Sequence, residues 1–516
     1  MSTFAPLSSK WLLLAGAVGL VGIVGNPAAL HAATGQLELR ILDKDSGQPI
    51  PCRMHLIGPK KKPFKPEKVT FWNDHFVVPG KLLLKLPLGN YSFVIERGPE
   101  YRDQTGHFTI NTFADDTKTI EMRRFVDMSA EGWWSGDLDV RRPVRDIELL
   151  MQADDLHVAQ VLAWRNDKAL TASASTKEPI VRFDNNRYYS LSTGALRQPG
   201  TELLLFNLPA PSKLPVANSD YPPLAKIVTD IRDNKKDVWV DASKPFWWDL
   251  PILVALGLVD SVEIAHSHIC RDSVTNNEAD GRARDRKLFS SLKGNTEWSQ
   301  EVYFRLLDCG LRIPPSAGSG SGEAANPVGY NRMYVHGDGE LSYEKWFEGL
   351  RAGRVFVTNG PLITTRVDGE LPGHVFQGEP GKKLELEVEL NFWTRDPITY
   401  LEIIKDGHVI QEVRFDEIPK TGKLPKIVFE QSGWFLLRAV TDVPKTYRFV
   451  MTAPYYVEFD SRPRISKSAA QFFLDWVYQR AKQIKLADPQ QQKEVLQWHR
   501  QARDYWQNLL SKANAE

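Results

Sequence analysis

Apolar and polar side chains alternate early in the chain in the way that a half-buried β-strand requires. The alternation covers residues 37–41 and ends at the turn-rich segment 43–47, and similar short strands are expected at 81–86 and 91–96. Short strands at this spacing are typical of a β-sandwich. The pattern therefore predicts a β-sandwich domain over residues 34–126.

A different pattern follows, in which short apolar runs alternate with stretches of helical periodicity. The apolar runs lie at 158–163, 203–206, 238–240 and 262–264. Strands that alternate with helices are typical of βα units and a parallel sheet. The sequence therefore predicts an α/β fold for residues 127–372.

The last part of the chain returns to strand alternation and then changes to helical spacing. Alternating segments predict a second β-sandwich at 373–460, and the tail 461–516 is predicted to be a helical hairpin. Asp488 followed by Pro489 is a helix start signal. The apolar stripe on that helix consists of Trp498, Ala502, Tyr505, Trp506 and Leu509. We expect this stripe to pack on the rest of the chain, and a partner-binding helix is the alternative.

The first 33 residues have the layout of a secretory signal peptide. An apolar, glycine-rich run at 11–24 follows Lys10, and small residues that suit cleavage after Ala32 or Ala33 come next. The run is shorter than the roughly 20 residues of a membrane span, although an uncleaved anchor is the alternative. The prediction is a periplasmic or secreted protein with no transmembrane segment in the mature chain.

The amino-acid composition limits which partners the chain can bind and which cysteine cross-links it can form. The chain has 65 Lys and Arg against 64 Asp and Glu, a net charge of +1, so it lacks the basic excess of a nucleic-acid binder. We expect no nucleic-acid partner. The three cysteines, Cys52, Cys270 and Cys309, form no zinc-type spacing. The sequence allows two states of the cysteines: a disulfide bridge between Cys270 and Cys309, or three buried free thiols.

Two tracts of the central region carry a family resemblance. Residues 132–143 contain the strand end Gly136, Asp137, Leu138, Asp139, Val140, Arg141, and residues 351–361 form the second tract. Together with segments between them they resemble the CehA/McbA-like branch of the PHP (polymerase and histidinol phosphatase) metallohydrolase superfamily. The resemblance implies a distorted seven-stranded α/β barrel that holds two or three metal ions and hydrolyses phosphoesters, carbamates or amides.

Most of the metal ligands that this resemblance implies are replaced. The two histidines of the first motif fall on Asp139 and Arg141, a later histidine on Lys244, and the terminal aspartate and histidine on glycines of the segment 318–322. Guanidinium stays protonated and cannot ligate a metal. Asp139 and His268 are the remaining metal-ligand candidates. A divalent metal should therefore be weakly held or absent, with fewer than two ions per chain.

The replaced positions suggest that side-chain cations take over the charge role of the metal ions at the mouth of the expected barrel. Five cations stand on or near the corresponding loops, namely Arg141, Arg142, Arg197, Lys244 and Arg332. Arginine forks bind carboxylate and phosphate, and the segment 318–322 either forms an anion-binding backbone nest or packs closely. The candidate pocket consists of Asp137, Asp139, Arg141, Arg142, Lys244, His268, Ser319, Ser321, Asn331 and Arg332. In the competing interpretation the cations point outward or pair with Asp137, Asp139 and Asp249, which leaves no net field in the pocket.

Three functions agree with these observations. The first is an exported homologue that is degenerate at the metal site and binds a small anionic or carbohydrate-type ligand in the barrel mouth. The second is an active metal-dependent phosphoester or amide hydrolase with a rearranged ligand set. The third is a non-catalytic envelope or glycan-associated binding protein.

Overall fold

The computed structural model describes residues 34–516 except 167, 171–178, 210–219 and 419–421, so the predicted signal peptide lies outside the described residues. Strands make up 39% of the structure and helices 21%. Within the described residues there are seven α-helices against 31 strands. The chain is thus rich in β-sheet, and the prediction of an α/β PHP-type barrel is wrong.

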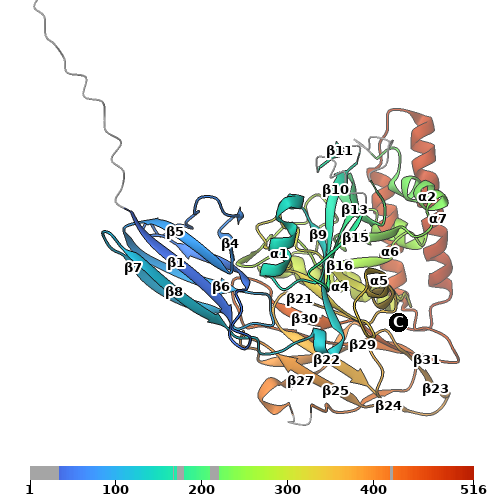
Figure 1. The fold of residues 1–516 in the computed structure, drawn as a ribbon. Coiled ribbons are helices and arrows are strands. Elements are labelled where there is room, and N and C mark those ends of the chain that lie inside the picture. The colour runs from blue at the N-terminus through green and yellow to red at the C-terminus, as the bar shows by residue number, and fades with distance from the viewer. Residues whose placement is uncertain (1–33, 167, 171–178, 210–219, 419–421) are drawn as a thin grey trace, which may run out of the picture.

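The N-terminal part is a β-sandwich that forms a separate lobe on one side of the molecule (Figure 1). One sheet has the order β5 (Lys81–Pro87), β1 (Thr34–Asp43), β8 (Asp115–Met122). The other has the order β3 (Phe71–Trp72), β4 (His75–Pro79), β2 (Pro51–Ile57), β6 (Gly89–Glu96), β7 (Gln104–Ile110). The strands predicted at 37–41, 81–86 and 91–96 are confirmed as β1, β5 and β6.

The central part joins parallel and antiparallel strands in one network. Its strands are β9 (Trp133–Val140), β10 (Val158–Arg165), β11 (Lys168–Ala169), β12 (Ile180–Phe183), β13 (Arg187–Gln198), β14 (Thr201–Phe206), β15 (Trp239–Ala242), β16 (Ser261–Ala265), β19 (Pro315–Ala317), β20 (Arg332–His336) and β21 (Val355–Thr358). The short strands β17 (Ile269–Cys270) and β18 (Ser273–Val274) pair separately. The helices are α1 (Ile147–Ala153), α2 (Leu224–Asn234), α3 (Leu250–Ala255), α4 (Gly294–Asp308) and α5 (Tyr343–Arg351).

The strand directions explain why the α/β prediction fails. β9 runs parallel to β10, and β10 to β13. However, the chain passes from β10 to β13 through further strands, and β13, β14 and β15 pair antiparallel. The apolar run 203–206 is therefore one arm of a hairpin with β13 and does not follow a crossover helix. β15, β16 and β19 return to parallel pairing.

The C-terminal part adds further sheet and two long helices. Its strands are β22 (Leu362–Val367), β23 (Val375–Gly378), β24 (Leu384–Leu386), β25 (Val388–Trp393), β26 (Tyr400–Lys405), β27 (His408–Arg414), β28 (Ile427–Phe429), β29 (Gly433–Val440), β30 (Phe449–Thr452) and β31 (Tyr455–Phe459). The helices α6 (Lys467–Gln483) and α7 (Pro489–Ser511) run side by side at the edge of the molecule opposite the N-terminal lobe (Figure 1). The predicted helical hairpin is confirmed.

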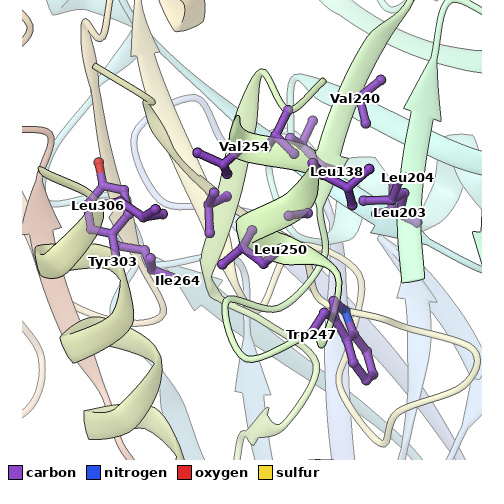
Figure 2. Close-up of a cluster of buried hydrophobic side chains, with 14 of the residues drawn as sticks. Leu138, Leu203, Leu204, Val240, Trp247, Leu250, Val254, Ile264, Tyr303 and Leu306 are labelled. Carbon is purple, nitrogen blue, oxygen red and sulfur yellow. The ribbon is translucent and has the colours of Figure 1, made fainter. Parts of the chain in front are cut away.

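One hydrophobic core links the central strands to the C-terminal helices. Leu138, Leu203 and Leu204 lie near the buried residues of α3 (Figure 2). Trp506 of α7 belongs to the same core, stacks on Phe473 at 4.8 Å between ring centroids, and donates its indole N–H to the carbonyl of Pro251 at 2.9 Å. The aromatic stripe of α7 therefore packs on the central part of the same protein.

Two smaller expectations are answered by the same structure. Cys52, Cys270 and Cys309 are all free and buried, so the interpretation as buried thiols holds. Among the described residues, no helix combines the length and the apolar character that crossing a bilayer demands.

Candidate functional site

A cavity of about 410 Å³ opens where several central strands end. Arg141 follows β9, Lys244 follows β15, Ser267 and His268 follow β16, and the loop after β19 closes another side. Parallel strands bring their carboxyl ends to one edge of a sheet, where loops commonly form binding sites. The full lining consists of Arg141, Arg197, Glu202, Lys244, Trp247, Ser267, His268, Cys270, Ser273, Thr275, Ala279, Gly320, Glu323, Ala324 and Ala325.

Arg141 lies in the cavity wall, but its charge is compensated. Its Nε is 2.6 Å from Oδ1 of Asp139 and its Nη2 is 2.9 Å from Oδ2 of the same carboxylate. Its Nη1 lies 3.3 Å from the carboxylate of Glu202 and also contacts Glu323. The competing interpretation, in which the cation pairs with a nearby aspartate, is therefore correct for Arg141.

Lys244 is the cation of the cavity that lacks a carboxylate partner. It is only 5% exposed, and its ammonium lies 5.0 Å from the ring centroid of Trp247. Across the described part of the chain, Lys244 makes no hydrogen bond and no ion pair. Burial lowers the pKa of its amine, and the charge of Glu202 opposes this shift.

Glu202 carries one of the negative charges of the cavity wall. Burial would raise the pKa of its carboxyl, but the neighbouring cations Arg141, Lys244 and Arg165 hold it at about 2. Glu202 is therefore ionised at every pH near neutrality. It lies in the field of Lys244 without contacting it, since no ion pair within 4.0 Å joins the two.

Two further buried carboxyl groups, Asp241 and Glu263, lie on β15 and β16, the strands that precede loops of the cavity. Burial raises the pKa of Asp241 to about 7, and its Oδ2 accepts hydrogen bonds from Ser261 and Ser316. Burial, together with the charges of Asp241 and Asp139, raises the pKa of Glu263 well above its usual range. Neither oxygen of Glu263 has a hydrogen-bond partner within the described residues. Glu263 therefore holds a proton more strongly than an exposed glutamate does.

The glycine-rich segment 318–322 is packed against this acidic layer. A Cβ on Gly318 would lie 2.3 Å from Oε1 of Glu263 and 2.6 Å from Cβ of Asp139. The backbone N–H of Gly318 donates to the carbonyl of Ala265, and that of Gly320 to the carbonyl of Asp139. These amides are already used inside the protein. The close-packing interpretation of the segment therefore holds, and it offers no open nest for an anion.

Asp137, Ser319 and Ser321 stabilise that segment. Asp137 accepts from the backbone N–H groups of Asp139, Ser319 and Gly329 at 2.8 to 3.0 Å, and burial raises the pKa of its carboxyl to about 6. Ser319 Oγ accepts from the N–H of Ser321 at 3.1 Å. The carbonyl of Ser321 accepts from the N–H of Arg141 at 2.8 Å.

Three other predicted pocket residues lie outside the cavity lining. The side-chain amide of Asn331 donates to the carbonyls of His266 and Ile269. Arg332 donates to the carbonyls of Gly329 and Asp154 and borders a separate small cavity. Arg142 packs over the ring of Trp72 at 4.8 Å. The expectation that Arg142 and Arg332 face the same mouth as Arg141 is wrong, because carbonyls and an aromatic ring of neighbouring segments hold them elsewhere.

The two metal-ligand candidates, Asp139 and His268, differ in whether hydrogen bonds already occupy their ligand atoms. Both oxygens of Asp139 accept from the guanidinium of Arg141, which leaves little of this carboxylate for an ion. His268 lines the cavity, and no described residue hydrogen bonds to its Nδ1. Burial lowers the pKa of His268 to about 3, so its ring is neutral. No described trio of His, Cys, Asp and Glu donors that could share one ion includes either residue.

Glu202 and Glu323 line the cavity but are absent from the predicted pocket, and so are the buried acids Asp241 and Glu263 on the neighbouring strands β15 and β16. Glu263 and Asp241 lie inside short apolar strands, where a single acidic residue is the available sequence signal. Buried acids without a cation partner are rare in strands. Glu323 follows the glycine-rich segment, and nothing in its local sequence distinguishes it from a surface residue.

Comparisons with known proteins reveal no relative that identifies the chain. No family model and no curated protein matches it. Two solved structures share low similarity with this chain. One is the Bacillus anthracis TIE protein, with 18% identity, coverage of 22% of this chain and 20% of that chain, and a TM-score of 0.15. The other is a pilus-presented adhesin, with 20% identity, coverage of 18% of this chain and 28% of that chain, and a TM-score of 0.14. Bacteroides uniformis beta-glucuronidase 3 is covered more broadly (10% identity, 82% and 61%, TM-score 0.16). This chain thus spans about a fifth of the first of these proteins.

Proposed function

We propose that the cavity binds a small anionic ligand whose acid group pairs with the ammonium of Lys244. The observation that carries the proposal is that this lysine is buried without a carboxylate partner among the described residues. It is 95% buried, it borders a cavity of about 410 Å³, and no described carboxylate lies within ion-pair distance of it. A buried charge without a partner is costly. An anion that enters the cavity would offset that cost.

The other cations of the cavity favour Lys244 as the anchoring group. Arg141 already contacts three carboxylates, and Arg197 lies 3.5 Å from Glu323 at the more exposed rim. A ligand acid would have to compete with these carboxylates for either arginine. No described carboxylate is in ion-pair contact with Lys244, so the strongest gain on binding is expected there.

The remaining wall favours a ligand that carries hydroxyl groups. Ser267, Ser273 and Thr275 supply hydroxyls that donate or accept, and Glu323 is an acceptor at the entrance. Trp247 is less available for stacking, because the ammonium of Lys244 lies over its ring and its N–H donates to Ser243 Oγ at 3.0 Å. A sugar acid or a sugar phosphate combines hydroxyls with an acid group and suits this cavity volume. The export predicted from residues 1–33 is part of the same proposal.

Isothermal titration calorimetry with phosphate, sulfate, glucuronate and galacturonate tests this function. The wild-type protein should bind at least one of them at one site per chain. Lys244→Met removes the charge and keeps most of the side-chain volume, and it should weaken binding by about 10-fold to 100-fold, the loss expected for one charged hydrogen bond.

The matched control is Lys493→Met, which removes an exposed lysine of α7 that lies outside the cavity lining. Its affinity should equal that of the wild type. The proposal is overturned if the wild type binds none of the four anions, or if Lys244→Met binds them as tightly as Lys493→Met does.

A further inference from the structure

Two buried histidines and one aspartate meet on the N-terminal sandwich, far along the sequence from the cavity. His55 of β2 and His75 of β4 are direct cross-strand partners, and their ring centroids lie 5.2 Å apart. Asp74 stands beside them in the two-residue turn between β3 and β4. The pairing register, and not sequence proximity, brings the two imidazoles together.

The possible ligand atoms of these three residues lie close to one another. Nδ1 of His55 is 3.1 Å from Oδ2 of Asp74, and Nδ1 of His75 is 3.0 Å from Oδ1 of the same carboxylate. One donor atom from each residue lies within 4.8 Å of the other two. Ligands at about 2.0 to 2.1 Å around one tetrahedral ion are separated by roughly 3.3 Å. We propose that His55, Asp74 and His75 form a binding site for one divalent transition metal ion.

The environment of His55 supports metal binding independently. Its second ring nitrogen, Nε2, is buried, has no hydrogen-bond partner in the described structure, and lies 3.5 Å from Oε2 of Glu96. Histidines that ligate a metal through one nitrogen usually direct the other N–H at a carboxylate, which fixes the ring. Glu96 is positioned for that role. Arg53 and Arg271 hold its carboxylate in place.

The site combines a buried interior with an accessible side. His55 and His75 are 5% and 2% exposed, whereas the side chain of Asp74 is 27% exposed. Two imidazoles and one carboxylate leave a fourth position for water, the ligand set that suits Zn²⁺.

The site would also fasten the sandwich to the central part. Trp72, two residues before Asp74, donates its indole N–H to the carbonyl of Ala324 at 2.9 Å. Ala324 belongs to the cavity lining. A metal that fixes the β3–β4 turn would therefore steady one contact of the loop that closes the cavity. The metal site itself stands on separate residues and does not depend on the proposed anion binding.

Titration of the chelator-treated, full-length protein with Zn²⁺ tests the site. One Zn²⁺ per chain should bind with a dissociation constant below about 10 µM, a binding free energy near 7 kcal/mol. Each of the variants His75→Gln and Asp74→Asn should lose at least about 100-fold in affinity. His107→Gln, on the exposed face of β7 in the same sheet, should bind like the wild type.

X-ray absorption of the wild-type zinc complex keeps the test valid if a variant fails to fold. Its spectrum should show two imidazole nitrogens and one or two oxygens at about 2.0 to 2.1 Å. Absence of stoichiometric binding, a zinc shell without two imidazoles, or binding that His268→Gln removes and His75→Gln leaves intact would each overturn the proposal.

Discussion

The guanidinium of Arg141 holds both carboxylate oxygens of Asp139, a residue two positions earlier in the chain. Both side chains are almost fully buried, at 8% and 1% exposed. The same two-residue spacing recurs at Arg414 and Asp416, where Nε and Nη2 lie 3.0 and 3.1 Å from the two carboxylate oxygens. There the side chains are 50% and 69% exposed. The same type of arginine–aspartate pair thus occurs once in the protein interior and once at the surface.

Removal of either arginine should reveal this difference in environment. Arg141→Ala leaves the carboxylates of Asp139 and Glu202 buried without their main cation, and it should lower the free energy of unfolding by about 3 to 5 kcal/mol. Arg414→Ala should leave the free energy of unfolding close to the wild-type value, because water screens an exposed pair. Urea unfolding of both variants is the measurement, and equal losses would contradict the account.

Asp241 should make the protein less stable as pH rises from about 4 to about 7. Its folded pKa, raised to about 7, means that the folded state keeps a proton that the unfolded state releases near pH 4. Rising pH between 4 and 7 therefore favours unfolding by up to about 1.4 kcal/mol per pH unit from this group. Asp241→Asn should become progressively more stable than the wild type over this range.

Urea unfolding at several pH values measures the effect. The control is Asp116→Asn on the exposed part of β8, for which the difference from wild type should not vary with pH in this way. A constant difference between Asp241→Asn and the wild type from pH 4 to 8 would show that the buried carboxyl does not titrate as expected.

The close approach of Gly318 to Glu263 and Asp139 should make this position intolerant of any side chain. Gly318→Ala is expected to cost about 1 to 3 kcal/mol through overpacking. Gly337→Ala is the control, since a Cβ there meets no atom within 4 Å. Thermal unfolding should therefore show a clear fall in melting temperature for the first variant only. A similar change in both would argue against tight packing at the segment 318–322.

The tail should depend on Trp506 for its attachment. This side chain is fully buried between the tail and the central core, so Trp506→Ala should cost about 3 to 5 kcal/mol. Tyr478→Ala, at a side chain 42% exposed on α6, should cost far less. Urea unfolding distinguishes the two, and a tail that serves only a partner protein would instead tolerate both changes.

The sequence predicts local structure where one physical signal acts alone. Alternation over 37–41 predicts β1, and Asp488 before Pro489 predicts the start of α7, where Asp488 accepts from the N–H of Gln490 at 2.7 Å. The run 203–206 carries no such signal, because strands buried on both faces are apolar throughout whether they pair parallel or antiparallel. The turn at Pro199 and Gly200 was the available clue to the hairpin.

The site is predictable from the sequence to a similar extent. Arg141, Lys244 and His268 follow strand ends, and the structure places all three in one cavity wall. Arg332 stands near the same motifs in the sequence, but two backbone carbonyls direct its guanidinium elsewhere. His55 and His75 meet only through the register of β2 and β4. Such long-range pairings cannot be found from residue spacing along the chain.

A crystal structure of the wild-type protein with the tightest-binding sugar acid or phosphate tests the central claim most directly. The account predicts that the acid group of the ligand lies within hydrogen-bond distance of Nζ of Lys244, with the Arg141 and Asp139 pair intact beside it. A ligand bound away from this cavity, for example beside Arg332, or bound in the cavity without contact to Lys244, would contradict the account.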